Sequence, residues 1–178
     1  MTCGLHLFPP NTRQNKPLKL ARNIGQNSFM AALSSNPVAD AGAQPASMNY
    51  SDWYKAVLAL VIWREARGEG AEGMRAVAHV IKNRVDASHL PDSWDTVIER
   101  KWQFSSMTAP GDPMLVQWPI HPDASFAQAM KIAAEVFSGS DPDLTSGATH
   151  YCNLNVCHPA WADTLHQVAV IGHHTFFR

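Results

Sequence analysis

The sequence predicts one α+β domain, mainly helical with a small antiparallel sheet, behind an irregular N-terminal tail. Apolar residues recur at helical spacing through residues 53–85, a capped apolar helix covers 123–139, and short alternating runs follow residue 148. A chain of 178 residues with 46% hydrophobic content can bury one core of ordinary size. No apolar run approaches the roughly 18 residues needed to span a bilayer, so we expect a soluble protein without stable membrane insertion.

Residues 1–47 differ from the rest, because five prolines interrupt a polar stretch that has no sustained periodicity. We expect a disordered or leader-like tail, with the folded domain at residues 48–178. A secretory signal is an alternative, but its apolar segment at 29–33 is shorter than the roughly 7–15 residues of a usual signal core. A further alternative is that translation begins at Met48, just before the first predicted helix.

Two helices are predicted in the first part of the domain. The run Trp53–Ala66 carries apolar side chains at helical intervals, and Gly68 and Gly70 interrupt the pattern after it. A second stripe then repeats at i, i+3, i+4, i+7 and i+11. The sequence therefore predicts two antiparallel helices joined by a short glycine loop. The second stripe consists of Met74, Val77, Ala78, Ile81 and Val85.

An acidic side chain stands at the end of the first predicted helix. Stepping about 100° per residue, Glu65 falls between Val61 and Leu58 on the helical wheel. Its carboxylate shares a face with aliphatic side chains, and desolvation there raises the pKa, which suits a general acid near neutral pH. The alternative is that Glu65 pairs with Arg64 or Arg67 at the fraying end of the helix.

The middle of the chain predicts two more helices separated by a loop. Ser93 caps a short helix at Ser93–Lys101, and an aromatic, Met-rich loop follows from Trp102 to Pro122. Asp123 caps the next helix, which Gly139 ends. We expect its core-facing stripe to consist of Phe126, Ala127, Met130, Ala133, Ala134 and Phe137.

Two short alternating runs, Ala148–Cys152 and Gln167–Ile171, predict β-strands near the end of the chain. We expect them to form the small antiparallel sheet of the α+β domain.

Several spaced motifs between residues 52 and 178 occur in the order typical of one family. They are Glu65-Ala-Arg-Gly-Glu69, Glu72-Gly73, Val77-Ala-His-Val80, Asn83-Arg-Val85, Trp102-Gln-Phe-Ser105, Gly147-Ala-Thr-His-Tyr151 and Pro159-Ala-Trp-Ala162. In this order they resemble the SleB-like cell-wall hydrolases, which include spore-cortex-lytic enzymes and some phage lysins. The resemblance implies a lysozyme-like fold, cleavage of peptidoglycan glycan strands, and Glu65 as the catalytic acid.

The mechanism depends on whether a second carboxylate is present. Most glycosidases place two acids about 5 Å or about 6.5 to 9.5 Å apart. Glu69 follows Glu65 by four residues, but it is also suited to fixing the loop by accepting backbone N–H groups. Without a second acid, the N-acetyl group or the C6 hydroxyl of the substrate attacks the anomeric carbon. The resemblance implies the C6 route, lytic transglycosylase chemistry that leaves a 1,6-anhydromuramoyl end; hydrolysis remains open.

Other polar residues are candidates for substrate contact. Gln103 and Ser105 stand in a predicted loop, where an amide and a hydroxyl can bind sugar substituents, and Tyr151 and Asn153 follow a predicted strand. Glu69 is a fifth candidate. Beyond these, Phe104 and Trp102 are expected in the core, and Trp161 is either a core residue or a platform for a sugar ring.

One cluster competes with the glycosidase interpretation. His150, Cys152, Cys157 and His158 supply the ligand types that zinc accepts, and a zinc amidase that cuts the stem peptide is the corresponding alternative. Their spacing matches no standard zinc arrangement, so we expect no metal and no other cofactor. We expect Cys152 and Cys157 to be two ordinary thiols, with a Cys152–Cys157 disulfide as a further alternative if the protein reaches an oxidising compartment.

Charge excludes one class of partner. The tail has four basic residues and one acidic residue, whereas residues 48–178 have ten basic and fourteen acidic residues. A mildly acidic domain argues against nucleic acid, which requires a basic surface. We expect a monomer that acts on peptidoglycan glycan strands in the cell envelope; a wall-binding module that has lost activity is the non-enzymatic alternative.

Overall fold

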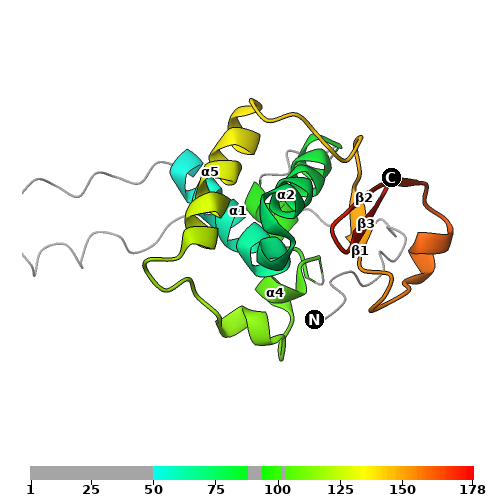
Figure 1. The fold of residues 1–178 in the computed structure, drawn as a ribbon, viewed down its shortest axis with the longest axis horizontal. Helices are drawn as coiled ribbons and strands as arrows, with labels where there is room; N and C mark the ends of the chain where they lie inside the picture. The colour runs from blue at the N-terminus through cyan, green and yellow to red at the C-terminus, as the bar shows by residue number, and fades with distance from the viewer. Residues whose placement is uncertain (1–49, 88–93, 102) are drawn as a thin grey trace, which may run out of the picture. The chain divides into compact units, whose positions relative to one another are not determined.

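The computed structural model describes residues 50–87, 94–101 and 103–178, and Figure 1 shows how they are arranged. These residues form five α-helices, three short 3₁₀ helices and three strands. The elements are α1 (Tyr50–Ala66), η1 (Arg67–Glu69), α2 (Gly70–Ala87), α3 (Trp94–Glu99), α4 (Ser105–Thr108), η2 (Pro113–Val116), α5 (Ala124–Ser138), β1 (His150–Cys152), η3 (Ala160–Asp163), β2 (Gln167–Ile171) and β3 (His174–Phe177).

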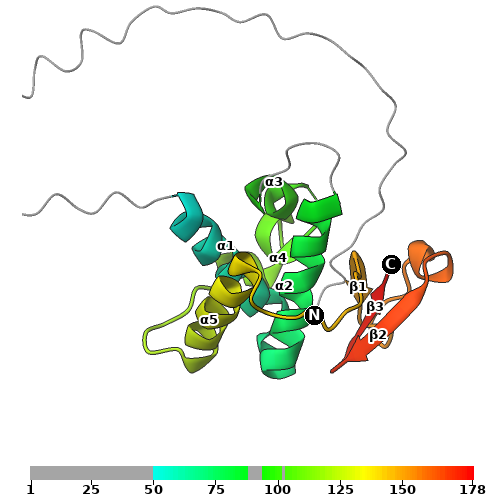
Figure 2. The same ribbon diagram turned by 90° about the horizontal axis from the view of Figure 1, so that it is seen from above.

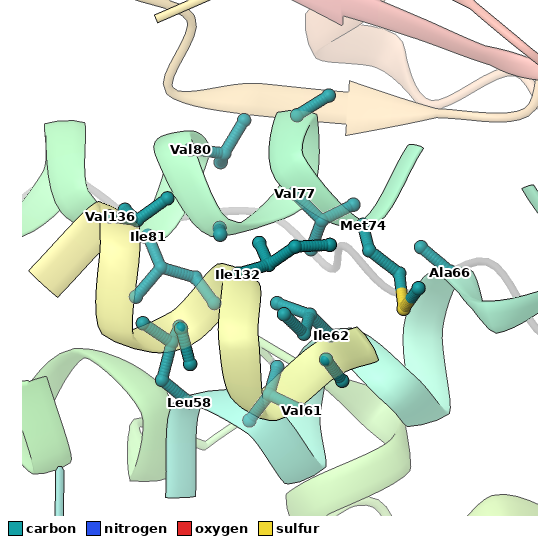
Figure 3. Packing of buried hydrophobic residues seen from close by; sticks show 14 of the residues in the cluster. Leu58, Val61, Ile62, Ala66, Met74, Val77, Val80, Ile81, Ile132 and Val136 are labelled. Carbon is teal, nitrogen blue, oxygen red and sulfur yellow. The ribbon is translucent and has the colours of Figure 1, made fainter. Parts of the chain in front are cut away.

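The core lies where α1, α2 and α5 meet, and Figure 3 shows their aliphatic side chains converging there. The second half of α1 is buried on nearly all sides, since Leu58, Ala59, Val61 and Ile62 are fully inaccessible to solvent. A helix buried all round needs no polar face. The carboxyl end of α1 therefore lies largely within the domain, where Glu65 is half-buried between the buried residues Arg64 and Ala66.

Helix α2 shows the predicted stripe, because Met74, Val77, Ala78 and Ile81 are all buried. It lies between the helices α1 and α5 on one side and the sheet on the other (Figure 2). The predicted glycine loop between α1 and α2 is the single 3₁₀ turn η1. Gly70 has φ of 72°, a left-handed value that glycine adopts without strain, and it separates η1 from the start of α2.

Helix α5 begins and ends as predicted, but its buried face is different. The side chain of Asp123 accepts a hydrogen bond from the Phe126 N–H, and Gly139 closes the helix in the left-handed conformation. The predicted stripe is wrong at three positions, Ala127, Met130 and Ala134, which are exposed. Helix α5 has apolar residues on several sides, so the sequence pattern did not single out the face that becomes buried. Packing against α1 and α2 buries a face other than the predicted one. The buried residues are Ala129, Ile132, Ala133 and Val136.

The sheet has three strands in the order β1-β3-β2, and both pairings are antiparallel. The prediction of a small antiparallel sheet is confirmed, and the two alternating runs contain β1 and β2. A third strand that was not predicted, β3, lies between them. Gly172, with φ of 59°, allows the two-residue turn that joins β2 to β3. Strand β3 was not predicted because its first two residues, His174 and Thr175, are polar.

The segment between α3 and α5 is more regular than predicted. It contains α4 and η2, the latter capped by the Asp112 side chain, which accepts the Met114 N–H. Phe104 is fully buried, as expected. The predicted cap Ser93, the aromatic Trp102 and the tail 1–47 lie outside the described residues.

None of the helices in the described ranges is both long and apolar enough to cross a bilayer.

Candidate active site

A cavity of about 300 Å³ opens where three parts of the chain meet. One wall is the end of α1 together with η1, the second is the segment from α4 to η2, and the third is β1 with the residues after it. Five of the six residues predicted to be functional line this cavity: Glu65, Glu69, Ser105, Tyr151 and Asn153. The fold therefore brings together polar side chains from segments far apart in the sequence.

Glu65 accepts hydrogen bonds from two side chains that reach it from the other walls. The Ser106 hydroxyl, on α4, donates to Oε1. The Tyr151 hydroxyl, on β1, donates to Oε2 at 3.0 Å. Because each carboxylate oxygen has its own donor, the carboxyl group is held in one orientation at the cavity wall.

The pKa of Glu65 is raised above its ordinary value of 4.5. Burial is the largest cause, because it disfavours the charged form, and the nearby negative charge of Asp112 acts in the same direction. The hydrogen bonds from Ser106 and Tyr151 oppose this shift without cancelling it. As expected from its place among aliphatic residues, Glu65 is suited to holding a proton and donating it.

The two neighbouring arginines do not pair with Glu65 in the described part of the chain. Arg64 is buried, and its guanidinium donates to the carbonyls of Ser106 at 3.0 Å, Leu115 at 3.1 Å and Gln117 at 3.0 Å. Arg67 donates to the Gln117 side chain at 2.7 Å. The ion-pair alternative for Glu65 is therefore wrong, because both cations are used to attach the α4–η2 segment to α1.

Glu69 has a different environment, although it lines the same cavity. Its carboxylate accepts the backbone N–H of His173 at 2.8 Å and faces the His173 ring at 3.0 Å. Burial works to raise the pKa of Glu69, but the hydrogen bonds from His173 and the charges of His173 and His174 outweigh it and lower the pKa. Glu69 thus fixes η1 to the β2–β3 turn, as the sequence allowed.

Tyr151 is buried on the sheet side of the cavity. Its ring stacks on Phe176, with centroids 5.8 Å apart, and meets the edge of His174 at 5.1 Å. Burial raises the pKa of Tyr151 well above 10, and the adjacent Glu65 raises it further. The phenol therefore stays protonated and acts as a hydrogen-bond donor.

Gln103, expected to contact substrate, does not line the cavity. It is 5% exposed, and its Oε1 accepts a hydrogen bond from Arg84 at 3.0 Å. Arg84 also donates to the Thr149 carbonyl at 2.6 Å, and burial lowers its pKa to about 10. Gln103 thus joins the residues before α4 to α2, and the predicted loop position gave no sign of this burial.

Sequence reasoning missed Ser106 and Asp112, which both line the cavity. Ser106 follows Ser105 in the predicted loop, where nothing distinguished one serine from the other. Only the helical turn α4 directs Ser106 toward Glu65. An Asp-Pro pair before an apolar residue is typical of a helix cap, so Asp112 could have been found by that signal.

The cysteine and histidine cluster does not form one centre. Cys152 is a buried free thiol, so the Cys152–Cys157 disulfide is wrong. The His150 ring packs against Trp161 at 5.1 Å, while His158 contacts Asp163 at 2.8 Å. Within residues 50–87, 94–101 and 103–178, no group of three or more His, Cys, Asp or Glu side chains is arranged to hold a metal ion.

Trp161 also packs against Phe177, with ring centroids 5.3 Å apart. It does not line the cavity. These contacts support the core alternative for Trp161 over the sugar platform.

The chain is similar to two sets of known proteins. It is 33% identical over 127 residues to the spore cortex-lytic enzyme of Halalkalibacterium halodurans, a match that covers 71% of this chain and 35% of that protein. It is 31% identical over 159 residues to the spore cortex-lytic enzyme of Oceanobacillus iheyensis, covering 87% of this chain and 53% of that protein. The chain thus spans about half, or less, of the length of these relatives.

Solved structures show the same fold. The catalytic domain of the germination-specific lytic transglycosylase SleB from Bacillus anthracis superposes with a TM-score of 0.58 at 27% identity, covering 76% of this chain and all of that one. The catalytic domain of Bacillus cereus SleB also gives 0.58, at 26% identity, covering 79% of this chain and all of that one. The mainly helical architecture with a three-stranded sheet is therefore the SleB catalytic-domain fold.

Residues 68–177 match the Cell Wall Hydrolase family, and the match begins three residues after Glu65. It covers more than half of the chain. This protein belongs to the Cell Wall Hydrolase family and is homologous to SleB.

Proposed function

We propose that this protein cleaves the glycan strands of peptidoglycan as a lytic transglycosylase, with Glu65 as its general acid and base. One observation carries the proposal: Glu65 lines the cavity, has a raised pKa, and is oriented by Ser106 and Tyr151. Homology to SleB, whose catalytic domain is that of a lytic transglycosylase, supports the same chemistry.

The reaction begins with Glu65 in its protonated form. The carboxyl proton passes to the glycosidic oxygen while the bond from that oxygen to the anomeric carbon breaks. The C6 hydroxyl of the same muramic acid residue then attacks the anomeric carbon, and the Glu65 carboxylate takes its proton. The product has a 1,6-anhydro ring, no water is consumed, and Glu65 is again protonated. The proton and the nucleophile come from the chain and the substrate, so this route needs no cofactor.

Ser106 and Tyr151 serve as positioning residues in this scheme. Their hydroxyls stabilise the carboxylate that exists between the two proton transfers, because charge-assisted hydrogen bonds are stronger than neutral ones. They also keep the pKa of Glu65 from rising further. The pair therefore balances the acid and the base roles of one carboxyl group.

Two further carboxylates line the cavity, but we assign neither to the chemistry. Glu69 accepts hydrogen bonds from His173, and Asp112 caps η2 by accepting the Met114 N–H at 2.8 Å. Both are used to fix the backbone around the cavity. Without a second acid to activate water, attack by the C6 hydroxyl of the substrate is the simpler route. Ser105, Asn153 and Glu69 remain our candidates for contacts with sugar substituents, since all three line the cavity.

Mass spectrometry of digested peptidoglycan tests the proposal. Lytic transglycosylase activity gives sugar fragments with anhydro ends, each one water lighter than the product of hydrolysis. Fragments with reducing ends would instead indicate a muramidase. Freed stem peptides would indicate an amidase. An unchanged wall that still binds the protein would indicate a binding module. The Glu65→Gln protein, prepared and assayed in parallel, is the control for contaminating activity.

We also propose that residues 48–178 suffice for this activity. Every residue assigned to the site lies within them. A chain that begins at Met48 is expected to cleave peptidoglycan at close to the rate of the full chain, and insolubility or inactivity of the shorter chain would refute the boundary.

A further inference from the structure

Three large apolar side chains are exposed at the end of η2 and on the segment that joins η2 to α5. The exposed fractions are 77% for Val116, 65% for Trp118 and 83% for Ile120. Gln117 between the first two has extended backbone angles, with φ −85° and ψ 132°. Side chains alternate along extended backbone, so Gln117 points away from its apolar neighbours. Exposed apolar residues gathered in this way mark an interaction site.

Two arginines of the candidate active site hold this segment. The Gln117 carbonyl accepts hydrogen bonds from Arg64 Nη2 at 3.0 Å and Nε at 3.2 Å, and the Gln117 side chain accepts one from Arg67 at 2.7 Å. Arg64 and Arg67 both line the cavity that contains Glu65. The position of Trp118 is therefore set relative to the cavity, although its own side chain lies at the surface.

The Trp118 ring is also oriented. The guanidinium carbon of Arg64 lies 5.0 Å from the ring centroid, a cation–π contact. Because most of the ring remains exposed, an open surface is available for a ligand. The C–H bonds on the face of a pyranose carry partial positive charge, which complements the negative face of an indole. An ordered, exposed indole loses little entropy when a sugar ring packs on it.

A lipid surface could also bind exposed apolar side chains, but the charges of the residues around this segment argue against it. Residues 103–130 contain no Lys or Arg, while Asp112 and Asp123 flank the exposed segment. Segments that bind anionic membranes usually combine apolar with basic side chains. A glycan strand suits the segment better, because Pro113 and Met114, which line the cavity, stand just before it in the chain. A polymer also continues beyond the bond that is cleaved.

We propose that Trp118 is a sugar-stacking platform that binds the glycan strand at a distance from the bond that is cleaved. The inference deepens the proposed function and rests on it for the identity of the ligand. Trp118 then favours long strands over short fragments, because only a long strand reaches the cavity and the platform together.

Binding to insoluble peptidoglycan tests the platform separately from cleavage. The measurement uses Glu65→Gln protein, so that the wall stays intact, with and without Trp118→Ala. We expect Trp118→Ala to weaken binding about tenfold, and Trp118→Phe to retain most of it. Trp53→Ala is the matched control, since Trp53 is 49% exposed and lies about 18 Å along α1 from Glu65. It should bind normally.

Kinetics supply a second readout in protein with Glu65 intact. We expect Trp118→Ala to lower kcat/KM about tenfold on long glycan strands and clearly less on a soluble tetrasaccharide. Equal losses on both substrates, or unchanged binding to the wall, would overturn the platform. The platform would also be overturned if Trp118→Ala abolished binding to anionic phospholipid vesicles but left binding to the wall unchanged. A protein dimer that dissociates in the Trp118→Ala variant would overturn it as well. If the wild-type protein binds through Trp118 but cleaves nothing, the proposed function fails and the platform stands.

Discussion

Glu65 and Glu69 stand four residues apart and line the same cavity, yet their surroundings move their pKa values in opposite directions. Glu65 ends a helix that is buried on nearly all sides, and burial outweighs the two hydroxyl donors that it receives. Glu69 lies one turn later, where His173 supplies a backbone N–H and a ring nitrogen. Chemically identical side chains thus differ in their tendency to hold a proton: the pKa of Glu65 is raised and that of Glu69 is lowered.

The difference shows what a pair of acids in a motif can mean. Glycosidases with two acids divide the work between a donor and a partner across the bond. Here the second glutamate is used within the protein, to join η1 to the β2–β3 turn. Environment rather than residue type separates the roles, so substitutions at both positions test the comparison directly.

The largest expected difference is in turnover. Glu65→Gln keeps the shape of the side chain but cannot donate the proton, and the rate should fall by at least about two orders of magnitude. Glu69→Gln should lower the rate by less than about tenfold, because it only weakens the contact that holds η1 to the β2–β3 turn. Rates of peptidoglycan solubilisation, with circular dichroism to check folding, measure both. The reverse ranking would show that the acid has been misassigned.

The pH dependence of turnover sharpens the comparison. If Glu65 is the general acid, as we propose, activity requires its protonated form, and the rate should fall as pH rises through its pKa, which lies above 4.5. Ser106→Ala and Tyr151→Phe each remove a donor that favours the ionised form. The pKa of Glu65 should therefore rise further, moving the basic limb of the pH profile to higher pH, and more so for Ser106→Ala. A shift to lower pH in either variant would contradict the assigned hydrogen bonds.

Stability should change in opposite directions at the two positions. Folding raises the pKa of Glu65, so its ionisation destabilises the native state as pH rises through the folded value. Glu65→Gln should raise the melting temperature at neutral pH, with no gain below about 4.5, the ordinary pKa of a glutamate. Thermal melts across pH would contradict this if the gain persisted in acid.

The Glu69 carboxylate has a lowered pKa, so its stabilisation is present above 4.5 and is lost as pH falls through the folded value. Glu69→Gln should therefore lower stability by about 1 kcal/mol at neutral pH, since a charge-assisted hydrogen bond becomes a neutral one. The same melts measure it. An unchanged melting temperature at neutral pH would mean that the contact with His173 contributes nothing.

The smallest expected effect is that of a chelator. If Glu65 supplies the acid without a metal, EDTA should leave turnover and melting temperature unchanged. Stoichiometric zinc in the purified protein, with loss of activity when it is removed, would favour the amidase and would leave neither glutamate as the acid.

Features that depend on neighbours along the chain could be predicted from the sequence. The stripe of α2, the Asp123 cap and Gly139 terminus of α5, and the placement of Glu65 among aliphatic residues all follow from spacings of a few residues. Such spacings report helical period and capping, and these persist whatever packs against the helix. The place of Glu65, which we propose as the acid, was therefore predictable from the sequence.

Tertiary structure decided what depends on residues far apart. The donors to Glu65 come from Ser106 and Tyr151, which are 41 and 86 residues away. The buried face of α5, the insertion of β3 between the other strands, and the burial of Gln103 were likewise chosen by packing. A local sequence pattern shows whether a side chain is apolar or polar. Which residue that side chain contacts is decided only in the tertiary structure, where separate segments compete for the same space and the same hydrogen bonds.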